Sequence, residues 1–175
     1  TAGHIFSKPG QPVYQPSPLD TGSRVLLDNQ IGVLEKWGLE PGRQPKVDGA
    51  LVKLVTSSLA AFTTPEGFLV TRTDQPYVGQ RVYKIGRTTG ITTSTVYITD
   101  VTSFVEGGYY LDGLIATAQN IAQPGDSGGP LLDAGTHALL GIATGADESR
   151  TYFTPFTSVL MAFGLPQDTP LVLPV

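Results

Sequence analysis

The alternation of apolar and polar residues along the chain predicts short strands and almost no helix. Apolar and polar residues alternate through 31–37, as in a half-buried strand, and 50–55 is a compact apolar run that follows a glycine. The other predicted strands follow at hairpin spacing and cover 81–86, 91–105, 113–118, 129–133, 137–145 and 151–156. Weaker strands are expected near 12–16 and 24–28. The chain is therefore predicted to be all-β.

One short helix is expected near the C-terminal end. Residues 158–164 have a helical pattern, with Thr157 or Ser158 as the N-cap and Gly164 as the stop signal. Pro, Gly and Asp recur through 63–80, which predicts a long connection between two lobes.

Composition narrows the class of protein. The chain has 175 residues, of which 40% are hydrophobic and 15% charged, so it is long enough for a core and is not disordered. The net charge is −4 and the basic residues are dispersed, which argues against a nucleic-acid partner. No apolar run is long enough to span a membrane, so no membrane partner is expected. Cysteine is absent, so disulfides and thiolate metal sites are excluded, and we expect neither a metal nor a cofactor. No signal peptide is visible, and the compartment stays open.

Ser127 is the strongest candidate for chemistry, because it lies in the string "GDSGGP" at 125–130. A serine hydroxyl becomes a nucleophile only beside an imidazole that takes its proton and donors that receive the oxyanion. Gly125 allows the backbone to curl so that its N–H and that of Ser127 point the same way. Gly128 and Gly129 leave space beside the hydroxyl for a substrate carbonyl. The alternative is a glycine-rich turn with an incidental serine, and the full six-residue string favours the nucleophile.

This string resembles the nucleophile motif of the chymotrypsin-like serine peptidases. "TAGH" at 1–4 resembles the sequence around the general base of that family, and "VDGALV" at 47–52 resembles the strand entry that carries its buried Asp. "GRTTGITT" at 86–93 is similar to a segment of the bacterial branch, which includes α-lytic protease and streptogrisin. The three candidate residues stand in the order of the family: His4, Asp48 and Ser127.

The resemblance implies a role for each of these residues. His4 would take the proton from Ser127 and return it to the leaving amine, while Asp48 would hold the histidine tautomer. The N–H groups of Gly125 and Ser127 would form the oxyanion hole.

Each assignment has an alternative. His4 could be a frayed terminal histidine and Asp48 an ordinary turn acid. Asp20 and Asp28 are the rival carboxylates, although both lie in stretches typical of solvated turns. His137 is the other histidine and is expected on a hairpin exposed to water, although some glutamate-specific relatives use a histidine to receive the substrate acid.

The resemblance also implies two packed antiparallel β-barrels with the site between them. An N-terminal lobe, 1–70, would carry the base and the acid, and a C-terminal lobe, 71–175, the nucleophile. About two or three strands are expected ahead of the histidine at ordinary strand lengths, whereas three residues precede His4. Ile5 also stands where relatives have Cys. We therefore expect an incomplete first barrel, completed by an upstream segment that acts as a partner. The alternatives are that a neighbouring copy of the chain donates the edge strand, or that the first lobe is open and His4 is displaced.

The primary pocket is predicted from the same resemblance. Ile121, six residues before the nucleophile, would lie at its bottom and offers no charge. The expected wall residues are Thr144, Gly145, Ala146 and Thr151. These residues predict small or medium apolar side chains at P1, the substrate residue before the cut bond, and no preference for Lys or Arg.

The sequence thus predicts a serine endopeptidase that hydrolyses peptide or protein substrates through an acyl-enzyme, its own chain among them. The alternative is a catalytically silent β-barrel module, kept for binding or structure. The complete set of candidate residues favours the enzyme.

Overall fold

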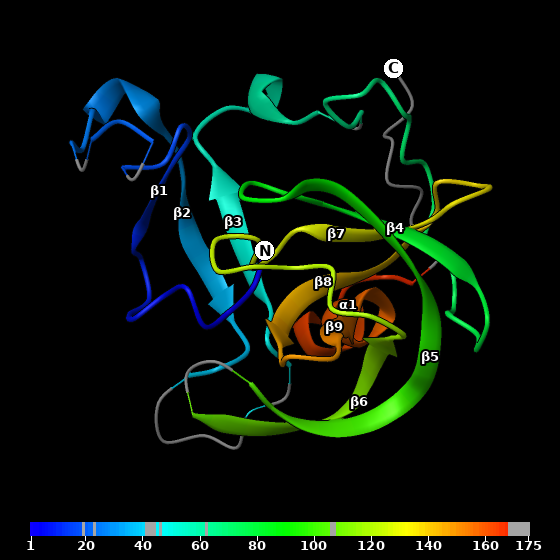
Figure 1. The fold of residues 1–175 in the computed structure, drawn as a ribbon. Coiled ribbons are helices and arrows are strands. Elements are labelled where there is room, and N and C mark those ends of the chain that lie inside the picture. The colour runs from blue at the N-terminus through cyan, green and yellow to red at the C-terminus, as the bar shows by residue number, and fades with distance from the viewer. Residues whose placement is uncertain are drawn as a thin grey trace.

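The computed structural model describes residues 1–18, 20–22, 24–40, 45, 47–61, 63–105 and 108–167. Its strands form two separate sheets (Figure 1). The first is a three-stranded antiparallel sheet made of β1 (Pro12–Tyr14), β2 (Gln30–Trp37) and β3 (Ala50–Leu54). Two short 3-10 turns, Leu27–Asn29 and Ser57–Leu59, flank β2 and β3.

The second sheet is a closed barrel in the order β4-β5-β6-β9-β8-β7. Its strands are β4 (Arg81–Gly86), β5 (Gly90–Val105), β6 (Tyr109–Thr117), β7 (Pro130–Asp133), β8 (Leu139–Ala146) and β9 (Thr151–Pro155). Helix α1 (Phe156–Phe163) follows directly. The prediction of an all-β chain with a barrel and a short C-terminal helix is confirmed.

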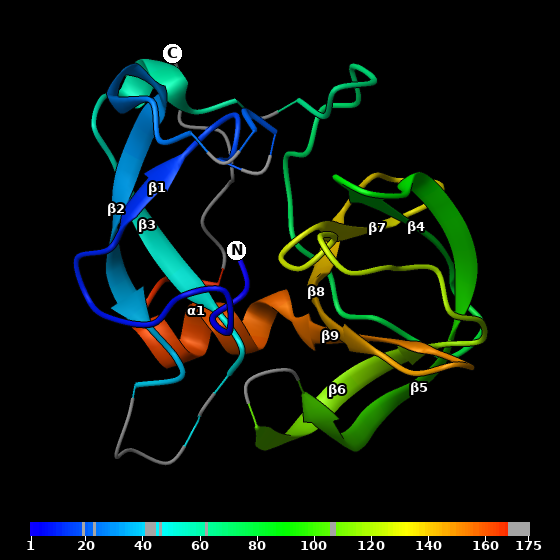
Figure 2. The same ribbon diagram turned by 60° about the vertical axis from the view of Figure 1, so that its left-hand side comes forward.

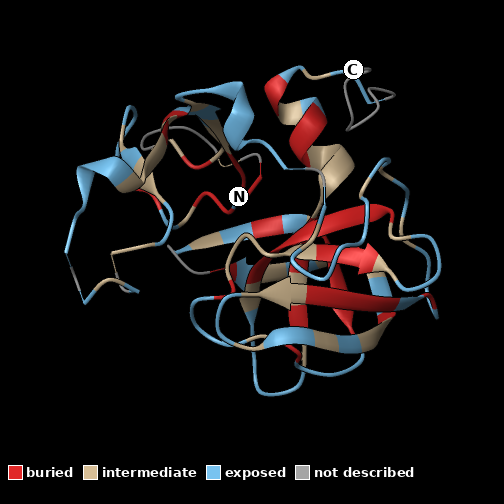
Figure 3. Cartoon of the chain, turned by 90° about the horizontal axis from the view of Figure 1, so that it is seen from above, coloured by how far each residue is buried: buried red, intermediate tan, exposed pale blue. Residues whose placement is uncertain are grey.

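The barrel closes because β5 is long and bent. Its register against β6 shifts three times between Val96 and Ser103, and such bulges bend a strand and increase its twist. One 16-residue strand can therefore curve around the barrel, as Figure 2 shows. The core inside consists of Val82, Val96, Ile115, Ile121, Leu131, Leu140, Ala143 and Phe153. Figure 3 shows buried segments along the barrel strands and exposed segments in many of the connecting loops.

Two boundaries differ from the predictions. The predicted strand at 24–28 is absent, since this stretch is irregular and runs into the 3-10 turn. The helix begins at Phe156, and its N-cap is Pro155 with no side-chain hydrogen bond, so the caps expected at Thr157 or Ser158 are wrong. Proline carries the dihedral that suits the entry to a helix, which explains the earlier start. Gly164, in the left-handed conformation at φ 67°, ends the helix as predicted.

Helix α1 connects the barrel to the first sheet, and the two lobes pack against each other through it (Figure 2). Val159 and Phe163 of the helix form a buried cluster with Ile142 of β8 and Val47, which precedes β3. The ammonium group of Lys36 in β2 donates a hydrogen bond to the Phe163 carbonyl at 2.7 Å.

The first sheet is open in the part of the chain that the structure describes. It has three strands and a small core of Phe6, Leu34 and Ala50, with Val13, Trp37 and Val52 beside it. An apolar cavity of about 470 Å³ remains between β3, α1 and the end of β8. Among the described residues, no helix is long and apolar enough to cross a membrane.

Candidate active site

Three side chains that are distant in sequence meet between the two lobes. His4 Nδ1 lies 2.7 Å from Asp48 Oδ2, and His4 Nε2 lies 2.8 Å from Ser127 Oγ. His4 is in the turn before β1, Asp48 just ahead of β3, and Ser127 in the turn before β7. The His4 side chain is 4% exposed and that of Asp48 is fully buried. The structure therefore brings the predicted base, acid and nucleophile into one hydrogen-bonded chain.

Asp48 holds both the backbone and the ring of His4. Its Oδ1 accepts the N–H groups of Gly3 at 2.6 Å and His4 at 2.8 Å. Its Oδ2 accepts the His4 ring and the Thr144 hydroxyl. Four donors thus surround the two oxygens of this buried carboxylate. Thr144 was expected in the pocket wall, but its hydroxyl is directed to Asp48 instead.

The acceptor role of Asp48 decides the tautomer of His4. An ionised carboxylate cannot donate a hydrogen bond, so Nδ1 carries the proton and Nε2 is left to accept from the Ser127 hydroxyl. The neutral ring thus has its basic nitrogen 2.8 Å from the oxygen that would lose a proton. This arrangement is suited to general-base catalysis.

Trp37, which the sequence analysis did not single out as a site residue, supports the turn that carries His4. Its indole N–H donates to the Gly3 carbonyl at 2.8 Å. Gly3 therefore receives one bond from β2 and gives one to Asp48.

The rival residues lie in other surroundings. The Arg87 side chain donates to Asp20 at 2.7 Å on the surface, and this hydrogen bond lowers the pKa of Asp20. Asp28 is exposed in the first 3-10 turn. His137 is half-buried in the turn between β7 and β8, where its Nδ1 lies within hydrogen-bonding distance of the Tyr83 hydroxyl, at 2.8 Å. Its ring stacks on Phe68 at 4.3 Å, so it is less exposed than the sequence analysis expected.

The backbone around Ser127 leaves two N–H groups without a protein acceptor. Gly125 has φ +100°, a conformation that side-chain-bearing residues rarely adopt. Within the described residues, the N–H groups of Gly125 and Ser127 make no hydrogen bond, whereas Asp126 donates to Gln123 and Gly128 donates to Ala143. Two unpaired donors beside a serine hydroxyl are what an oxyanion requires.

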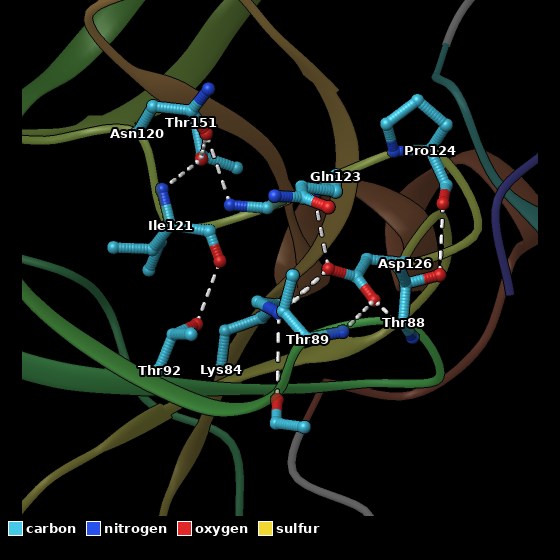
Figure 4. Close-up of polar contacts among 12 residues, drawn as sticks. Lys84, Thr88, Thr89, Thr92, Asn120, Ile121, Gln123, Pro124, Asp126 and Thr151 are labelled. Carbon is cyan, nitrogen blue, oxygen red and sulfur yellow. Dashed lines mark hydrogen bonds and ion pairs between the residues drawn. The ribbon is translucent and has the colours of Figure 1, made fainter.

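Asp126 ties this loop to the barrel (Figure 4). Its Oδ1 accepts the N–H groups of Thr88 at 2.7 Å and Thr89 at 3.2 Å. Its Oδ2 accepts the Thr89 hydroxyl at 2.7 Å, the Lys84 ammonium at 2.9 Å and the Gln123 N–H at 3.1 Å. Burial raises the pKa of Asp126, but the hydrogen bonds from Thr89 and Lys84 outweigh burial and hold it far below its ordinary value.

Lys84 is another functional-site residue that was not predicted from sequence. Its side chain is fully buried and forms an ion pair with Asp126, the residue before Ser127. A lysine at a core-facing position of the predicted strand 81–86 was the available signal, since an unpaired charge is rarely buried.

A cavity of about 270 Å³ opens beside Ser127. It is lined by Asn120, Ala122, Gln123, Pro124, Asp126, Ser127, Ala143, Gly145 and Ala146. Gly145 and Ala146 were expected there. Ile121 and Thr151 are not among the lining residues.

Ile121 is turned the other way, into the barrel core, and is 7% exposed. The Thr151 hydroxyl accepts the Ile121 N–H at 2.8 Å and donates to Asn120 Oδ1 at 3.0 Å, and the Ile121 carbonyl accepts the Thr92 hydroxyl at 2.7 Å (Figure 4). These bonds hold the backbone so that Asn120 and Ala122, the two neighbours of Ile121, line the cavity.

Comparison with known proteins identifies the family. The trypsin-like peptidase domain matches residues 1–142, and the chain belongs to this family. It is 34% identical to streptogrisin-D of Streptomyces griseus over 171 residues, which are 93% of this chain and 43% of that protein. The chain therefore spans less than half the length of this curated relative.

Solved structures agree with this assignment. Thermobifida fusca protease A is 26% identical, with a TM-score of 0.69 over 94% of this chain and 80% of that one. A glutamic-acid-specific serine protease that uses a histidine triad in substrate binding is 25% identical, with a TM-score of 0.62 over 77% of this chain and 72% of that one.

Proposed function

We propose that this chain is a serine endopeptidase domain in which Ser127 is the nucleophile, His4 the general base and Asp48 the residue that orients the base. The observation that carries the proposal is the continuous chain of hydrogen bonds from Asp48 through His4 to Ser127, at 2.7 and 2.8 Å. Each end of this chain comes from a different lobe, so only the folded protein assembles it.

In the proposed reaction, Ser127 Oγ attacks the carbonyl carbon of the scissile bond while its proton moves to His4 Nε2. The oxyanion accepts the N–H groups of Gly125 and Ser127. The C–N bond then breaks, the proton passes from Nε2 to the leaving amine, and an ester links the acyl group to Ser127. Water then attacks this ester while its proton moves to Nε2, the bond between the acyl carbon and Oγ breaks, and Nε2 returns the proton to Ser127 Oγ as the acid is released. Asp48 remains ionised throughout and stabilises the imidazolium.

The proposed substrates are peptides or proteins with an uncharged P1 residue. Support comes from the lining of the cavity, which includes no cation, and from its one acid, Asp126, which already accepts five hydrogen bonds. A charged P1 side chain would find no free partner of opposite sign there. Copies of the same chain are included among the substrates, so purified parent should fragment on storage while Ser127→Ala stays intact by mass.

A fluorophosphonate probe tests the nucleophile. The parent should gain one label, and Ser127→Ala should gain none. Ser58→Ala, which changes an exposed serine, is the matched control and should be labelled like the parent. Labelling of Ser127→Ala would contradict the assignment. A folded parent that takes no label would favour the silent binding module.

We further propose that an extended apolar segment from outside residues 1–175 pairs with the free edge of β3. Among the described residues, β3 pairs only with β2, apart from two bonds between Ala50 and Thr1: the Ala50 N–H donates to the Thr1 carbonyl at 2.8 Å, and the Thr1 ammonium donates to the Ala50 carbonyl at 3.3 Å. The apolar cavity of about 470 Å³ lies beside this edge, and apolar side chains of an added strand would bury its walls. In a longer natural form of the protein, the amides of residues 51–54 should exchange more slowly with solvent. Equal exchange in both forms would overturn this partner.

A further inference from the structure

Asn120, in the cavity beside Ser127, has a side-chain amide whose orientation its neighbours determine. Its Oδ1 accepts the Ala122 N–H at 3.0 Å, and its Nδ2 donates to the Asp147 carbonyl at 2.8 Å. A backbone N–H can only donate and a backbone carbonyl can only accept, so oxygen and nitrogen cannot be exchanged. The Thr151 hydroxyl accepts the Ile121 N–H and therefore donates its own hydrogen to Asn120 Oδ1, at 3.0 Å.

This network uses every hydrogen-bonding position of the amide except one. Oδ1 accepts two hydrogen bonds and has no lone pair left. Nδ2 carries two hydrogens, and only one of them has an acceptor among the described residues. Asn120 is exposed and lines the cavity, so this second hydrogen is open to an acceptor from a bound substrate.

The other lining residues decide which acceptor fits. Alanine side chains at 122, 143 and 146 make much of the surface apolar. A substrate carboxylate would meet one N–H, no cation and the nearby carboxylate of Asp126, so it is disfavoured. Gln123 is exposed, and its side-chain amide makes no hydrogen bond within the described part of the chain. It can therefore accept from an –NH₂ group of the substrate.

We propose that Asn120 is a specificity-determining residue that selects P1 side chains with a neutral carbonyl acceptor, Gln and Asn, over apolar side chains of the same shape. This inference rests on the proposed peptidase function and replaces the apolar P1 preference expected from sequence. An apolar P1 residue displaces water from the Asn120 N–H and leaves it unpaired. One such lost bond reduces kcat/KM by about tenfold.

Two pairs of peptides test this, each differing only at P1: Gln against Met, and Asn against Leu. The parent should cleave the Gln and Asn peptides with kcat/KM about tenfold higher than their apolar partners. Asn120→Asp keeps the two acceptor bonds at Oδ1 and replaces the donor by an oxygen, so the ratio should fall to one or below. Gln119→Glu introduces the same charge at a neighbouring residue outside the cavity lining and should keep the parental ratio.

A ratio measured within one preparation does not depend on the fraction of folded protein. Equal or faster cleavage of the Met and Leu peptides by the parent overturns the inference and leaves the proposed function intact. If the parent cleaves none of the four peptides, the proposed function fails, and dissociation constants with Ser127→Ala decide the inference. Tighter binding of the Gln peptide than the Met peptide supports it, and equal binding overturns it.

Discussion

The barrel and the three-stranded sheet both contribute residues to one site, but they differ in how completely each is closed and packed. The barrel is closed, has an apolar core through its centre, and holds the loop of Ser127 by a buried ion pair. Within the described part of the chain, the sheet is open and has a much smaller core, yet the segments that lead into its strands carry His4 and Asp48. Its site residues are held by local bonds to Gly3 and by contact with the barrel through Thr144. The position of the nucleophile therefore depends on the packing of the whole barrel, whereas the position of the base depends on a few hydrogen bonds.

If the two regions act as one catalytic unit, removing a residue from either should have nearly the full effect. Ser127→Ala and His4→Ala should each lower kcat by about 10⁴–10⁶, and the double variant should be little worse than either single one. Ser127→Ala should unfold at the same denaturant concentration as the parent, whereas His4→Ala takes one donor from the buried Asp48 carboxylate and should unfold at a somewhat lower one. Losses in kcat that simply multiply would show that the two regions contribute independently.

The ion pair between Lys84 and Asp126 should be the most sensitive point of the barrel. Lys84→Met leaves the Asp126 carboxylate buried without its cation, which should lower the free energy of unfolding by about 3–5 kcal/mol. Lys53→Met, at an exposed position of β3, is the matched control and should have almost no effect. Urea denaturation measures both. The double variant Lys84→Met with Asp126→Asn should recover part of the loss. A single variant as stable as the control would mean that the barrel does not depend on this pair.

A substitution in the three-stranded sheet should affect activity more than stability, in contrast to the substitution of Lys84 in the barrel. Trp37→Phe removes the indole N–H that the Gly3 carbonyl accepts, at a cost of about 1 kcal/mol in stability. Because Gly3 is adjacent to His4 and bonded to Asp48, kcat should fall while KM changes little. Steady-state kinetics at one pH separates the two. A change in KM alone would show that Trp37 acts on substrate binding and not on the base.

The features that could be predicted from the sequence are those encoded in a local, continuous pattern of residues. The strands at 81–86 and 91–105 were predicted because their pattern of side chains is local and continuous. The resemblance supplied His4, Asp48 and Ser127, which no periodicity could bring together. The position six residues before the nucleophile did not identify the cavity residue correctly, because sequence spacing does not show which of two adjacent side chains turns toward the cavity.

That failure has a physical cause. Residues 118–126 form a loop without regular repeat, so the direction of each side chain depends on tertiary bonds. The Ile121 N–H donates to the Thr151 hydroxyl, and the Ile121 side chain packs in the barrel core. As a result, the neighbouring residue Asn120 lines the cavity. The partner of Lys84 was equally hidden, because Asp126 lies 42 residues further along the chain.

The smallest predicted effect concerns the turn between β8 and β9, which links the cavity to the barrel rim. The Asp147 carboxylate accepts the Tyr152 hydroxyl at 2.6 Å and the N–H groups of Ser149 and Arg150. These bonds, that of Tyr152 first, lower the pKa of Asp147 from 3.8 to about 2. Because the folded pKa lies below the unfolded one, the stabilisation is present above pH 4 and is lost as the pH falls through about 2.

The matching variant is Asp147→Asn, which keeps one acceptor oxygen and has no titration. The parent should be slightly more stable than this variant at pH 6, and the difference should shrink between pH 4 and pH 2. Asp74→Asn, at another exposed acid, is the control for general charge effects and should show a weaker dependence on pH. Thermal unfolding across this range measures both pairs. The Asn120 amide also donates to the Asp147 carbonyl. As the pH falls, the preference for the Gln peptide over the Met peptide should therefore decrease before the barrel loses stability. A Gln-to-Met ratio of dissociation constants, measured with Ser127→Ala, that is constant from pH 6 to pH 2 would show that this turn does not act on the pocket.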